Sequence, residues 1–506
     1  MEILISAFRF IGIVLLVIMM FNIMIVVHEW GHFLAGRWRG LHIDRFQIWF
    51  GKPLWKKTIN GVQYGLGSIP AGGFVSLPQM APMEAIEGKV EEGGEEKPKK
   101  ELPPITPLDK IIVAFAGPLF SFLLAVVFAC LVFVVKRPIS EAVSSTTIGH
   151  VLEKVENAEG EEIESPASKA GLRRGDKITF VDGKKVERFQ GMNDSIMWTI
   201  ISSDNQNIEV DFLRDGKEMS VVVERPAEAT HAKVDGPWFK QVWAYLSRRP
   251  PIRTIGIYPQ VSAIVIETLE NSPAAAAGIR KGDHFKAING QEMVDAKAVS
   301  EFEWTAGEEY QILIGRSGKD INVPVIPRVP EVEGTDPKIG IVRWSAKGLE
   351  PLERENPIAQ VIDSFNAIVK TLKAVFSPKS DVKAGHLSGP FGIMGLYYDL
   401  FQDSEGWRKV LWFSVLLNVN LAILNLLPFP VLDGGHIVMA TVEWVGKRPI
   451  PFKILEAVQT AFVLFLLGFM AFVTLKDVGD RLPSGEAEVS KEPAKKPPAF
   501  LPLQTQ

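Results

Sequence analysis

The chain has 506 residues, of which 47% are hydrophobic and 23% are charged, and its formal net charge at pH 7 is -4. This mixture indicates membrane spans joined to soluble domains, and the length allows roughly three or four modules. No basic run is interleaved with aromatic residues, so we expect no nucleic-acid partner. Cys130 is the only cysteine, which excludes an intramolecular disulfide and leaves histidine and carboxylate as the metal ligands to look for.

Four apolar stretches approach the roughly 20 residues that a helix needs to cross a bilayer. They are about 5–27, 110–135, 409–429 and 456–475. The N-terminus lacks the cationic start and cleavage site of a secretory signal, so we expect it to remain as a membrane anchor. Lys and Arg crowd the link between the first two spans and recur at Lys447 and Arg448 between the last two. By the positive-inside rule both links are cytoplasmic, which leaves the large middle region and both termini outside.

The first apolar stretch ends in HEWGH, from His28 to His32. In an H-E-x-x-H motif the two histidines lie four residues apart on one helix face, so both imidazoles can hold one metal while Glu29 activates its water. Ionisable groups are costly in lipid, so their presence at this depth indicates a functional site. The motif predicts metalloprotease chemistry in the cytoplasmic half of the membrane.

SIPAGGFVSL, at 68–77, is predicted to be an edge strand in a membrane re-entrant β region over 38–77. Its glycines would let a second backbone approach, so an unwound substrate could be held there by strand addition. The substrate-binding residues expected on this strand are Gly72, Gly73, Phe74 and Val75. The alternative is a hairpin that only plugs the site. Residues 78–107, rich in Glu, Lys and Pro, predict a disordered cytoplasmic loop.

One block of sequence repeats at an offset of 107 residues, starting at Ser165 and again at Ser272. Each copy reads as a short helix, a Gly-Asp turn, a strand and a hairpin turn, which predicts two copies of one small α+β domain. The copies resemble PDZ domains of bacterial membrane and envelope proteases in circularly permuted order, because each is followed by an I-G-I strand. PDZ domains take up an extended peptide along a sheet edge; the alternative is a pair of spacers that bind nothing. The expected peptide-binding residues are Ile255, Gly256, Ile257, Ile339, Gly340 and Ile341.

Apolar residues recur at helical spacing between Pro357 and Phe376 and predict an amphipathic helix. We expect it to lie at the outer membrane surface, although packing on the repeated domains is the alternative.

A catalytic zinc needs a third protein ligand and one open position. The segment from Leu424 to His436 contains Pro428 and Pro430, which cannot continue a regular helix. Broken backbone at membrane depth is tolerated only where it is buried in protein or lines a wet cavity. A carboxylate there suits a metal, so Asp433 is a candidate for the third ligand, and His436, three residues further on, is its rival.

Five motifs in this order resemble the site-2 protease family of intramembrane zinc proteases, in its bacterial regulator of sigma-E protease branch. They are HEWGH at 28–32, SIPAGGFVSL at 68–77, AGPLFS at 116–121, LSGPFGI at 387–393 and NLLPFPVLDGG at 425–435. The resemblance implies that His28, His32 and Asp433 bind one Zn²⁺ ion, that Glu29 is the general base, and that Asn425 assists substrate or transition-state binding. Pro428 and Pro430 are expected to contact substrate. AGPLFS by itself indicates only close helix packing.

We therefore expect a polytopic α-helical membrane protein with four transmembrane helices, a membrane-associated β-hairpin or sheet and two α+β PDZ domains. The expected order is a first transmembrane helix with HExxH over 1–37, the re-entrant β region over 38–77, the disordered loop over 78–107, a second transmembrane helix over 108–136, PDZ domains over 140–259 and 260–346, the interfacial helix over 355–378, a third transmembrane region over 387–435, a fourth transmembrane helix over 436–478 and a disordered tail over 479–506.

The function expected from the motifs and the resemblance is cleavage of transmembrane segments of single-span proteins in the bacterial inner membrane, after a separate site-1 protease has shortened them. Substrates of the anti-sigma factor or remnant signal peptide type are implied by the resemblance. The PDZ pair would act as a size filter or would capture a new C-terminus. Two alternatives remain, a catalytically silent PDZ membrane adaptor and a metal transporter, although the only repeat in this sequence is soluble whereas transporters usually repeat their spans.

Overall fold

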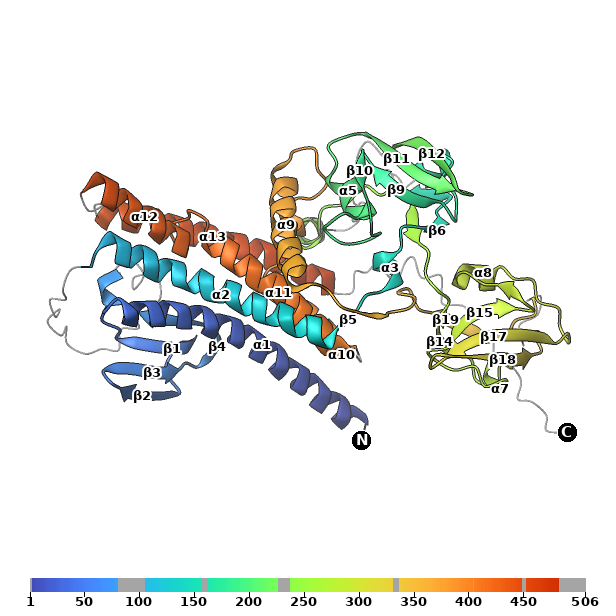
Figure 1. Cartoon of the computed structure of the whole chain (residues 1–506), viewed down its shortest axis with the longest axis horizontal. Helices are drawn as coiled ribbons and strands as arrows, with labels where there is room; N and C mark the ends of the chain where they lie inside the picture. Colours follow the sequence, from blue (N-terminus) through green and yellow to red (C-terminus); the bar gives the residue numbers. More distant parts are fainter. Residues whose placement is uncertain are drawn as a thin grey trace. The chain divides into compact units, whose positions relative to one another are not determined.

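The structure is a computed structural model that describes residues 2–80, 105–156, 162–225, 237–330, 336–403, 405–447 and 452–481. Most of the loop predicted over 78–107 and of the tail predicted over 479–506 lies outside the described residues. The chain divides into two compact units (Figure 1). The membrane unit comprises Met1–Arg137, Glu353–Val369 and Leu387–Val478, and the repeat unit comprises Pro138–Leu352, Lys370–His386 and Gly479–Gln506.

The membrane unit is built mainly from long apolar helices. They are α1 (Glu2–Trp38), α2 (Pro107–Val135), α10 (Pro390–Gln402), α11 (Gly406–Asn425), α12 (Asp433–Gly446) and α13 (Phe452–Arg481), with α9 (Pro357–Phe376) shared between the units. Four stretches are long and apolar enough to cross a membrane, namely Leu4–Trp38, Pro107–Val135, Gly406–Asn425 and Leu455–Arg481. The number of spans agrees with the prediction from the sequence.

Helix α2 starts where its sequence supplies a complete capping box. The hydroxyl of Thr106 accepts from the Asp109 amide, and the Asp109 carboxylate accepts from the Thr106 amide. These bonds satisfy two backbone donors that a helix start leaves free. Arg39, just after α1, donates to the same carboxylate at 2.6 Å, so the end of α1 and the start of α2 are joined by an ion pair.

Helix α11, the third candidate span, is followed by α12 in the same direction. Arg408, at the start of α11, donates to the carbonyl of Lys136 at the end of α2, at 3.3 Å. Glu443, near the end of α12, pairs with Lys110 in the first turn of α2 at 2.7 Å. Helices α11 and α12 therefore run together, antiparallel to α2, along its whole length (Figure 1).

The prediction of one fourth transmembrane helix over 436–478 is wrong in its start. Residues 433–446 form α12, and a new helix, α13, begins at Phe452. Lys447 closes α12 with a left-handed φ of 50°, and the sequence that follows contains Pro449 and Pro451. The candidate span of this region, Leu455–Arg481, lies in α13 alone.

Asp477, near the end of α13, caps the first turn of α10. The Asp477 carboxylate accepts from the amides of Gly389 and Gly392, each at 2.9 Å. A Cβ at Gly392 would lie 2.5 Å from the Asp477 Oδ1 atom. The glycines of LSGPFGI thus allow this carboxylate to cap a helix whose first amides would otherwise have no partner.

Between α1 and α2 the chain forms a four-stranded sheet in the order β2-β3-β1-β4. Its strands are β1 (Arg45–Phe50), β2 (Trp55–Ile59), β3 (Val62–Leu66) and β4 (Ile69–Ser76), followed by the short helix η1 (Pro78–Met80). As predicted, the SIPAGGFVSL segment lies at an edge of the sheet. The Trp49 indole donates to the Asn22 side chain on α1 at 2.5 Å, which fixes β1 against the helix that carries HEWGH.

The repeat unit contains two copies of one topology. The sheets have the orders β10-β9-β11-β12 and β16-β15-β17-β18, and each copy adds a two-stranded sheet, β13-β6 or β14-β19. The first copy contains α3 (Glu141–Ser144), β6 (Ile148–Val151), β7 (Lys154–Glu156), β8 (Glu162–Glu164), α4 (Pro166–Lys169), β9 (Lys177–Val181), β10 (Lys184–Lys185), α5 (Ile196–Ser202), β11 (Asn207–Arg214), β12 (Lys217–Glu224), α6 (Trp238–Ser247) and β13 (Ile257–Pro259). The second contains β14 (Val265–Thr268), α7 (Pro273–Ala276), β15 (His284–Ile288), β16 (Gln291–Glu292), α8 (Ala296–Ser300), β17 (Tyr310–Arg316), β18 (Lys319–Val325) and β19 (Ile341–Trp344). Strands β5 (Arg137–Pro138) and β20 (Leu352–Glu353) lie where the chain passes between units, and η2 (Ala384–His386) follows α9.

The aspartate of the repeated Gly-Asp pair makes the same interactions in both copies. Asp176 accepts two hydrogen bonds from Arg214, both at 2.7 Å, and Asp283 accepts two from Arg316 at the same distances. Each aspartate also accepts from the backbone amide three residues before it. Both carboxylates are 1% exposed, so these bidentate pairs keep a buried charge satisfied and hold the turn against the sheet.

Helix α9 agrees closely with the amphipathic helix predicted over 355–378. Its side chains at Ile358, Ile362, Phe365 and Phe376 are all exposed. Its position at the membrane surface stays a prediction.

Candidate metal centre

The two histidines of HEWGH come from the buried side of α1. His28 and His32 lie four residues apart, one helical turn, and are 8% and 3% exposed. Their rings contact each other edge to face, with centroids 4.9 Å apart. The regular helix therefore points both imidazoles at one place, as the spacing predicts.

Asp433 reaches the same place from the break between α11 and α12. The segment after Asn425 turns back through short-range bonds, such as the Leu432 amide to the Phe429 carbonyl at 2.9 Å. A Cβ at Gly434 would lie 2.3 Å from the Leu426 carbonyl oxygen, and one at Gly435 would lie 2.0 Å from that of Phe429. Only glycine fits at these positions, so the D-G-G sequence lets the broken segment fold tightly over the first turn of α12 and present Asp433.

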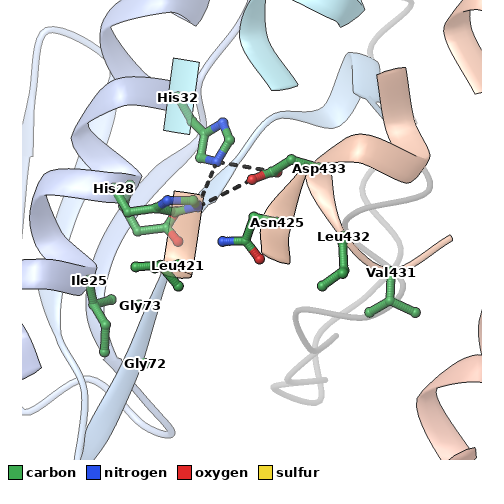
Figure 2. A pocket seen from close by; sticks show the side chains of 11 residues that line it. Ile25, His28, His32, Gly72, Gly73, Leu421, Asn425, Val431, Leu432 and Asp433 are labelled. Atoms are coloured by element: carbon green, nitrogen blue, oxygen red, sulfur yellow. Dashed lines mark hydrogen bonds and ion pairs between the residues drawn. The ribbon is translucent and has the colours of Figure 1, made fainter. Parts of the chain in front are cut away.

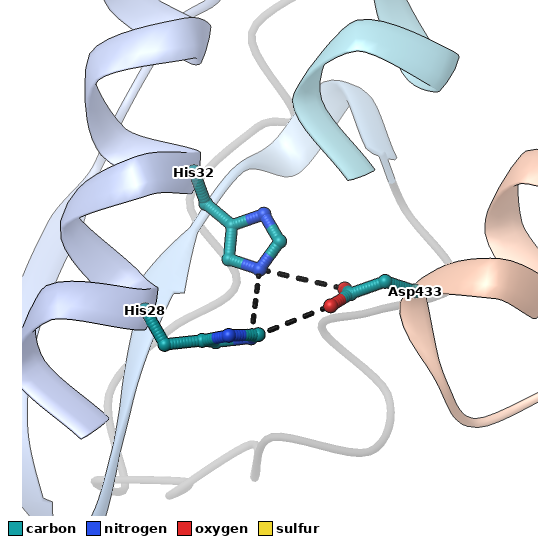
Figure 3. A group of neighbouring side chains, drawn as sticks. All are labelled: His28, His32 and Asp433. Atoms are coloured by element: carbon teal, nitrogen blue, oxygen red, sulfur yellow. Dashed lines mark hydrogen bonds and ion pairs between the residues drawn. The ribbon is translucent and has the colours of Figure 1, made fainter. Parts of the chain in front are cut away.

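Ligand-type atoms of three residues meet here with spacings that fit a zinc site. The two histidine Nε2 atoms are 3.3 Å apart, Asp433 Oδ2 lies 3.3 Å from His28 Nε2, and Asp433 Oδ1 lies 3.4 Å from His32 Nε2 (Figure 3). Ligand atoms at about 2.0–2.1 Å from a tetrahedral zinc are themselves about 3.3–3.4 Å apart. Two imidazoles and one carboxylate are also a common donor set for catalytic zinc, with the fourth position left for water or substrate. The residues present fit the ion.

Helix α2 orients both imidazoles through contacts with their Nδ1 atoms. His32 Nδ1 lies 2.8 Å from the Val113 carbonyl, which can only accept, so Nδ1 carries the proton and Nε2 keeps its lone pair. His28 Nδ1 lies 3.0 Å from the fully buried hydroxyl of Ser121. Between these contacts, a Cβ at Gly117 would lie 2.2 Å from His32 Nε2. One face of α2, at positions four residues apart, thus forms the outer support of the site.

The sequence interpretation missed this role for Gly117 and Ser121. It assigned AGPLFS to close helix packing, which the structure does show, since a Cβ at Gly31 would lie 2.4 Å from the Ala116 carbonyl oxygen. The same four-residue spacing that marks a packing face also marks a face that can hold two histidine rings. Nothing in the spacing alone distinguishes the two uses.

The three residues line a cavity of about 290 Å³ together with other predicted site residues (Figure 2). Its lining comprises Ile25, His28, Glu29, His32, Gly72, Gly73, Leu421, Asn425, Val431, Leu432 and Asp433. Figure 2 shows the Asn425 amide projecting into it from the end of α11. On the opposite wall, a Cβ at Gly73 would lie 3.7 Å from the Glu29 Cγ atom. The cavity therefore brings the edge strand β4, Glu29 and the ligand group to one place.

Other predicted site residues lie elsewhere. Phe74 is buried and stacks on Phe50 with ring centroids 6.4 Å apart, and Val75 belongs to the core beneath the sheet. Pro428 and Pro430 shape the broken segment but are not among the residues that line this cavity. His436 is buried on α12 but is not part of the group whose ligand atoms lie together.

The residues expected to bind peptide occupy matching places in the two repeated domains. Ile255, Ile257 and Ile339 are at most 5% exposed and belong to the two cores, and Ile341 packs against the second core. The glycines between them, Gly256 and Gly340, take positive φ of 85° and 84°. The carbonyls of Ile255 and Ile339 accept from the first turns of α4 and α7. These side chains support the domain cores, and peptide binding by the backbone stays a prediction.

A buried group of two histidines and one aspartate, with a glutamate beside it and membrane-crossing helices around it, defines the class of membrane metalloproteases. Residues 16–469 match the model of peptidase family M50, the site-2 protease family, and the chain belongs to this family. Protease RseP of Yersinia pestis is 26% identical over 474 residues, which cover 89% of this chain and 95% of the relative. The regulator of sigma-E protease RseP of Escherichia coli (strain K12) is 25% identical over 479 residues, with 89% and 95% covered.

These matches confirm the family suggested by the motifs. Peptidases of family M50 depend on zinc, so the chain is a zinc metalloprotease. Its four apolar helices and its bacterial relatives make it a bacterial inner-membrane protein.

Proposed function

We propose that the chain cleaves transmembrane segments of single-span membrane proteins, inside the bilayer and after another protease has shortened them. The observation that carries this proposal is the buried group of His28, His32 and Asp433 in a cavity that is also lined by Glu29 and by the edge strand β4. The name of one relative, regulator of sigma-E protease RseP, favours substrates of the anti-sigma factor type. Remnant signal peptides are the second substrate type that we propose.

In this proposal His28, His32 and Asp433 hold the zinc ion. Bound zinc supplies a Lewis acid for hydrolysis of a peptide bond. Glu29 accepts the proton of the attacking water and later passes it to the leaving amine. Asn425 donates its amide to the charge that develops on the scissile carbonyl oxygen.

Strand β4 is the proposed binding site for the unwound substrate. A peptide bond in a helix is shielded by its own hydrogen bonds, so the substrate must become extended before it can be cut. A strand at a sheet edge offers main-chain partners to an extended segment. Gly73 lies directly beside Glu29, with its Cβ position 3.7 Å from the Glu29 Cγ atom, so a segment added along the free edge of β4 would lie close to the base.

The two repeated domains are proposed to be PDZ domains that select substrates on the outer side of the membrane. The orientation follows from the positive-inside rule, which places the metal centre toward the cytoplasmic half and both chain termini outside. The domains would exclude bulky outer domains or would capture a new C-terminus. Substrates that share one transmembrane segment separate these mechanisms: a filter makes cleavage depend on the size of the outer domain, whereas capture makes it depend on the last residues.

The function is tested by incubating the purified protein with a truncated single-span substrate and locating the cut by mass spectrometry. Wild-type protein should cut within the transmembrane segment. Glu29→Gln should keep its zinc and lose cleavage, because the carboxylate that moves the proton is gone while the ligands remain. Equal cleavage by both proteins would contradict the assignment of Glu29. Full zinc with no cleavage of several truncated substrates by the wild type would favour a silent adaptor.

A further inference from the structure

Helix α6 of the repeat unit carries an apolar face that the described part of the protein leaves largely uncovered. Its sequence from Trp238 to Ser247 is WFKQVWAYLS. At 100° per residue, the side chains of Trp238, Phe239, Val242 and Trp243 fall on one side, and Lys240 falls on the other. On the apolar side, Trp238 is 75% exposed, Phe239 56%, Val242 47% and Trp243 46%.

Exposure of this kind sets α6 apart from the other helices of the two repeated domains. Helix α5 buries Ile196 and Ile200 in the first core, and α8 buries Val299 in the second. Helix α6 also belongs to one copy only: in the described residues of the second copy, no helix lies between β18 and β19. Helix α6 is therefore not required by the shared domain fold.

The C-terminal end of α6 is fixed to the end of a membrane-crossing helix. A Cβ at Gly479, in the last turn of α13, would lie 2.1 Å from the Ser247 carbonyl oxygen, so the two backbones touch. Arg249, two residues after Ser247, donates to the Asp480 carboxylate at 2.5 Å. Gly479 and Asp480 belong to the same compact unit as α6 and lie in the last turn of the span Leu455–Arg481. The charged end of a span lies at the level of the lipid headgroups.

We propose that α6 lies in the interfacial region of the bilayer, with Trp238, Phe239, Val242 and Trp243 in the acyl boundary and Lys240 toward the headgroups. Tryptophan is enriched at membrane interfaces because its ring is apolar and its N–H is polar. A short amphipathic helix with a basic residue on its polar face is typical of segments that lie in the plane of the interface. Such a helix would attach the first repeated domain to the membrane surface directly, in addition to its contacts with the end of α13. This inference does not depend on the proposed proteolytic function.

The test uses the full chain in lipid nanodiscs of phosphatidylethanolamine and phosphatidylglycerol. The native cysteine is removed with Cys130→Ala, and one new cysteine, Phe239→Cys or Lys240→Cys, is labelled with an environment-sensitive fluorophore. These neighbouring positions lie about 100° apart on the helix, so Lys240→Cys is the matched control. The label at 239 should be shifted to the blue, quenched by lipids that carry a shallow nitroxide, and several-fold less quenched by aqueous iodide than the label at 240.

Equal iodide quenching at both positions, without nitroxide quenching, would overturn the proposal. A label at 239 that is shielded without lipid quenching would show a protein partner instead. That partner is a second copy if shielding changes with the number of chains per disc, and a substrate segment if shielding requires added substrate. As a second test, Trp238→Ser combined with Trp243→Ser should abolish lipid quenching at 239 while zinc content stays unchanged. Retained lipid quenching in this variant would contradict the role given to the aromatic face.

Discussion

Gly117→Ala should remove zinc from the protein although it adds only one methyl group. The new Cβ would lie 2.2 Å from His32 Nε2 and 2.9 Å from His28 Cε1, whereas real Cβ contacts essentially never fall below 3.0 Å. The His32 nitrogen must therefore move by at least the difference, 0.8 Å. Zinc–ligand distances tolerate deviations of only about 0.2 Å, and loss of outer support alone costs about 10- to 100-fold in metal affinity. We expect a loss of more than about 100-fold.

The assay is zinc content per chain by mass spectrometry, together with affinity from competition with a chelator of known strength. Gly12→Ala on α1 and Gly468→Ala on α13 are matched controls, because a Cβ at either position would meet nothing within 4 Å. In all three variants alanine favours the helix by roughly 0.5–1 kcal/mol, so a general loss of helix stability cannot explain a difference. Zinc bound by Gly117→Ala with wild-type affinity would refute the placement of α2 against the histidines.

Three further predictions concern the support of the metal, the substrate wall and the repeated domains. Ser121→Ala removes the hydroxyl that faces His28 Nδ1 and should weaken zinc binding about 10- to 100-fold in the same competition assay; unchanged affinity would contradict an orienting role. Gly73→Val should leave zinc content unchanged and lower kcat/KM for a truncated substrate, because the new side chain enters the wall of the cavity, and unchanged kinetics would argue against binding along β4. Burial alone would raise the pKa of the Asp283 carboxyl, but the hydrogen bonds and charge of Arg316 hold that pKa below its ordinary value. The stability that this carboxylate contributes is therefore full above the pKa of an unfolded aspartate and lost as pH falls through the lowered folded value. The protection factors of the β17 amides, which correct for the intrinsic pH dependence of exchange, should fall over that range in the wild type. Asp283→Asn, which cannot titrate, should be protected less at neutral pH and should not show this pH dependence.

The parts of the site that follow from local sequence could be predicted. A helix places residues four apart on one face, so HEWGH alone brings His28 and His32 together. The prolines before Asp433 indicate broken backbone at membrane depth, which makes Asp433 and His436 candidate ligands, and the resemblance of the motif favours Asp433. The repeated Gly-Asp turn likewise predicts two similar domains, and the structure shows the shared topology.

The parts that depend on how helices pair could not be predicted. Gly117 and Ser121 gain their roles only because α2 lies against the histidine face of α1, and their spacing is equally typical of simple packing. The continuation of α11 by α12 along α2 could not be predicted, because the apolar stretch in the sequence ends near the prolines. The helix that continues beyond Asp433 was therefore assigned to the fourth crossing. The close fit of Gly434 and Gly435 under the carbonyls of the broken segment appears only in three dimensions.

The most direct test of the account is X-ray absorption at the zinc edge, with zinc content, for the wild type, Asp433→Asn and His436→Ala. The account predicts zinc in the wild type with nitrogen and oxygen neighbours at about 2.0–2.1 Å. It also predicts loss of zinc in Asp433→Asn and retention of the wild-type spectrum in His436→Ala. Zinc lost from the His436 variant and kept by the Asp433 variant would contradict the assignment of the metal centre.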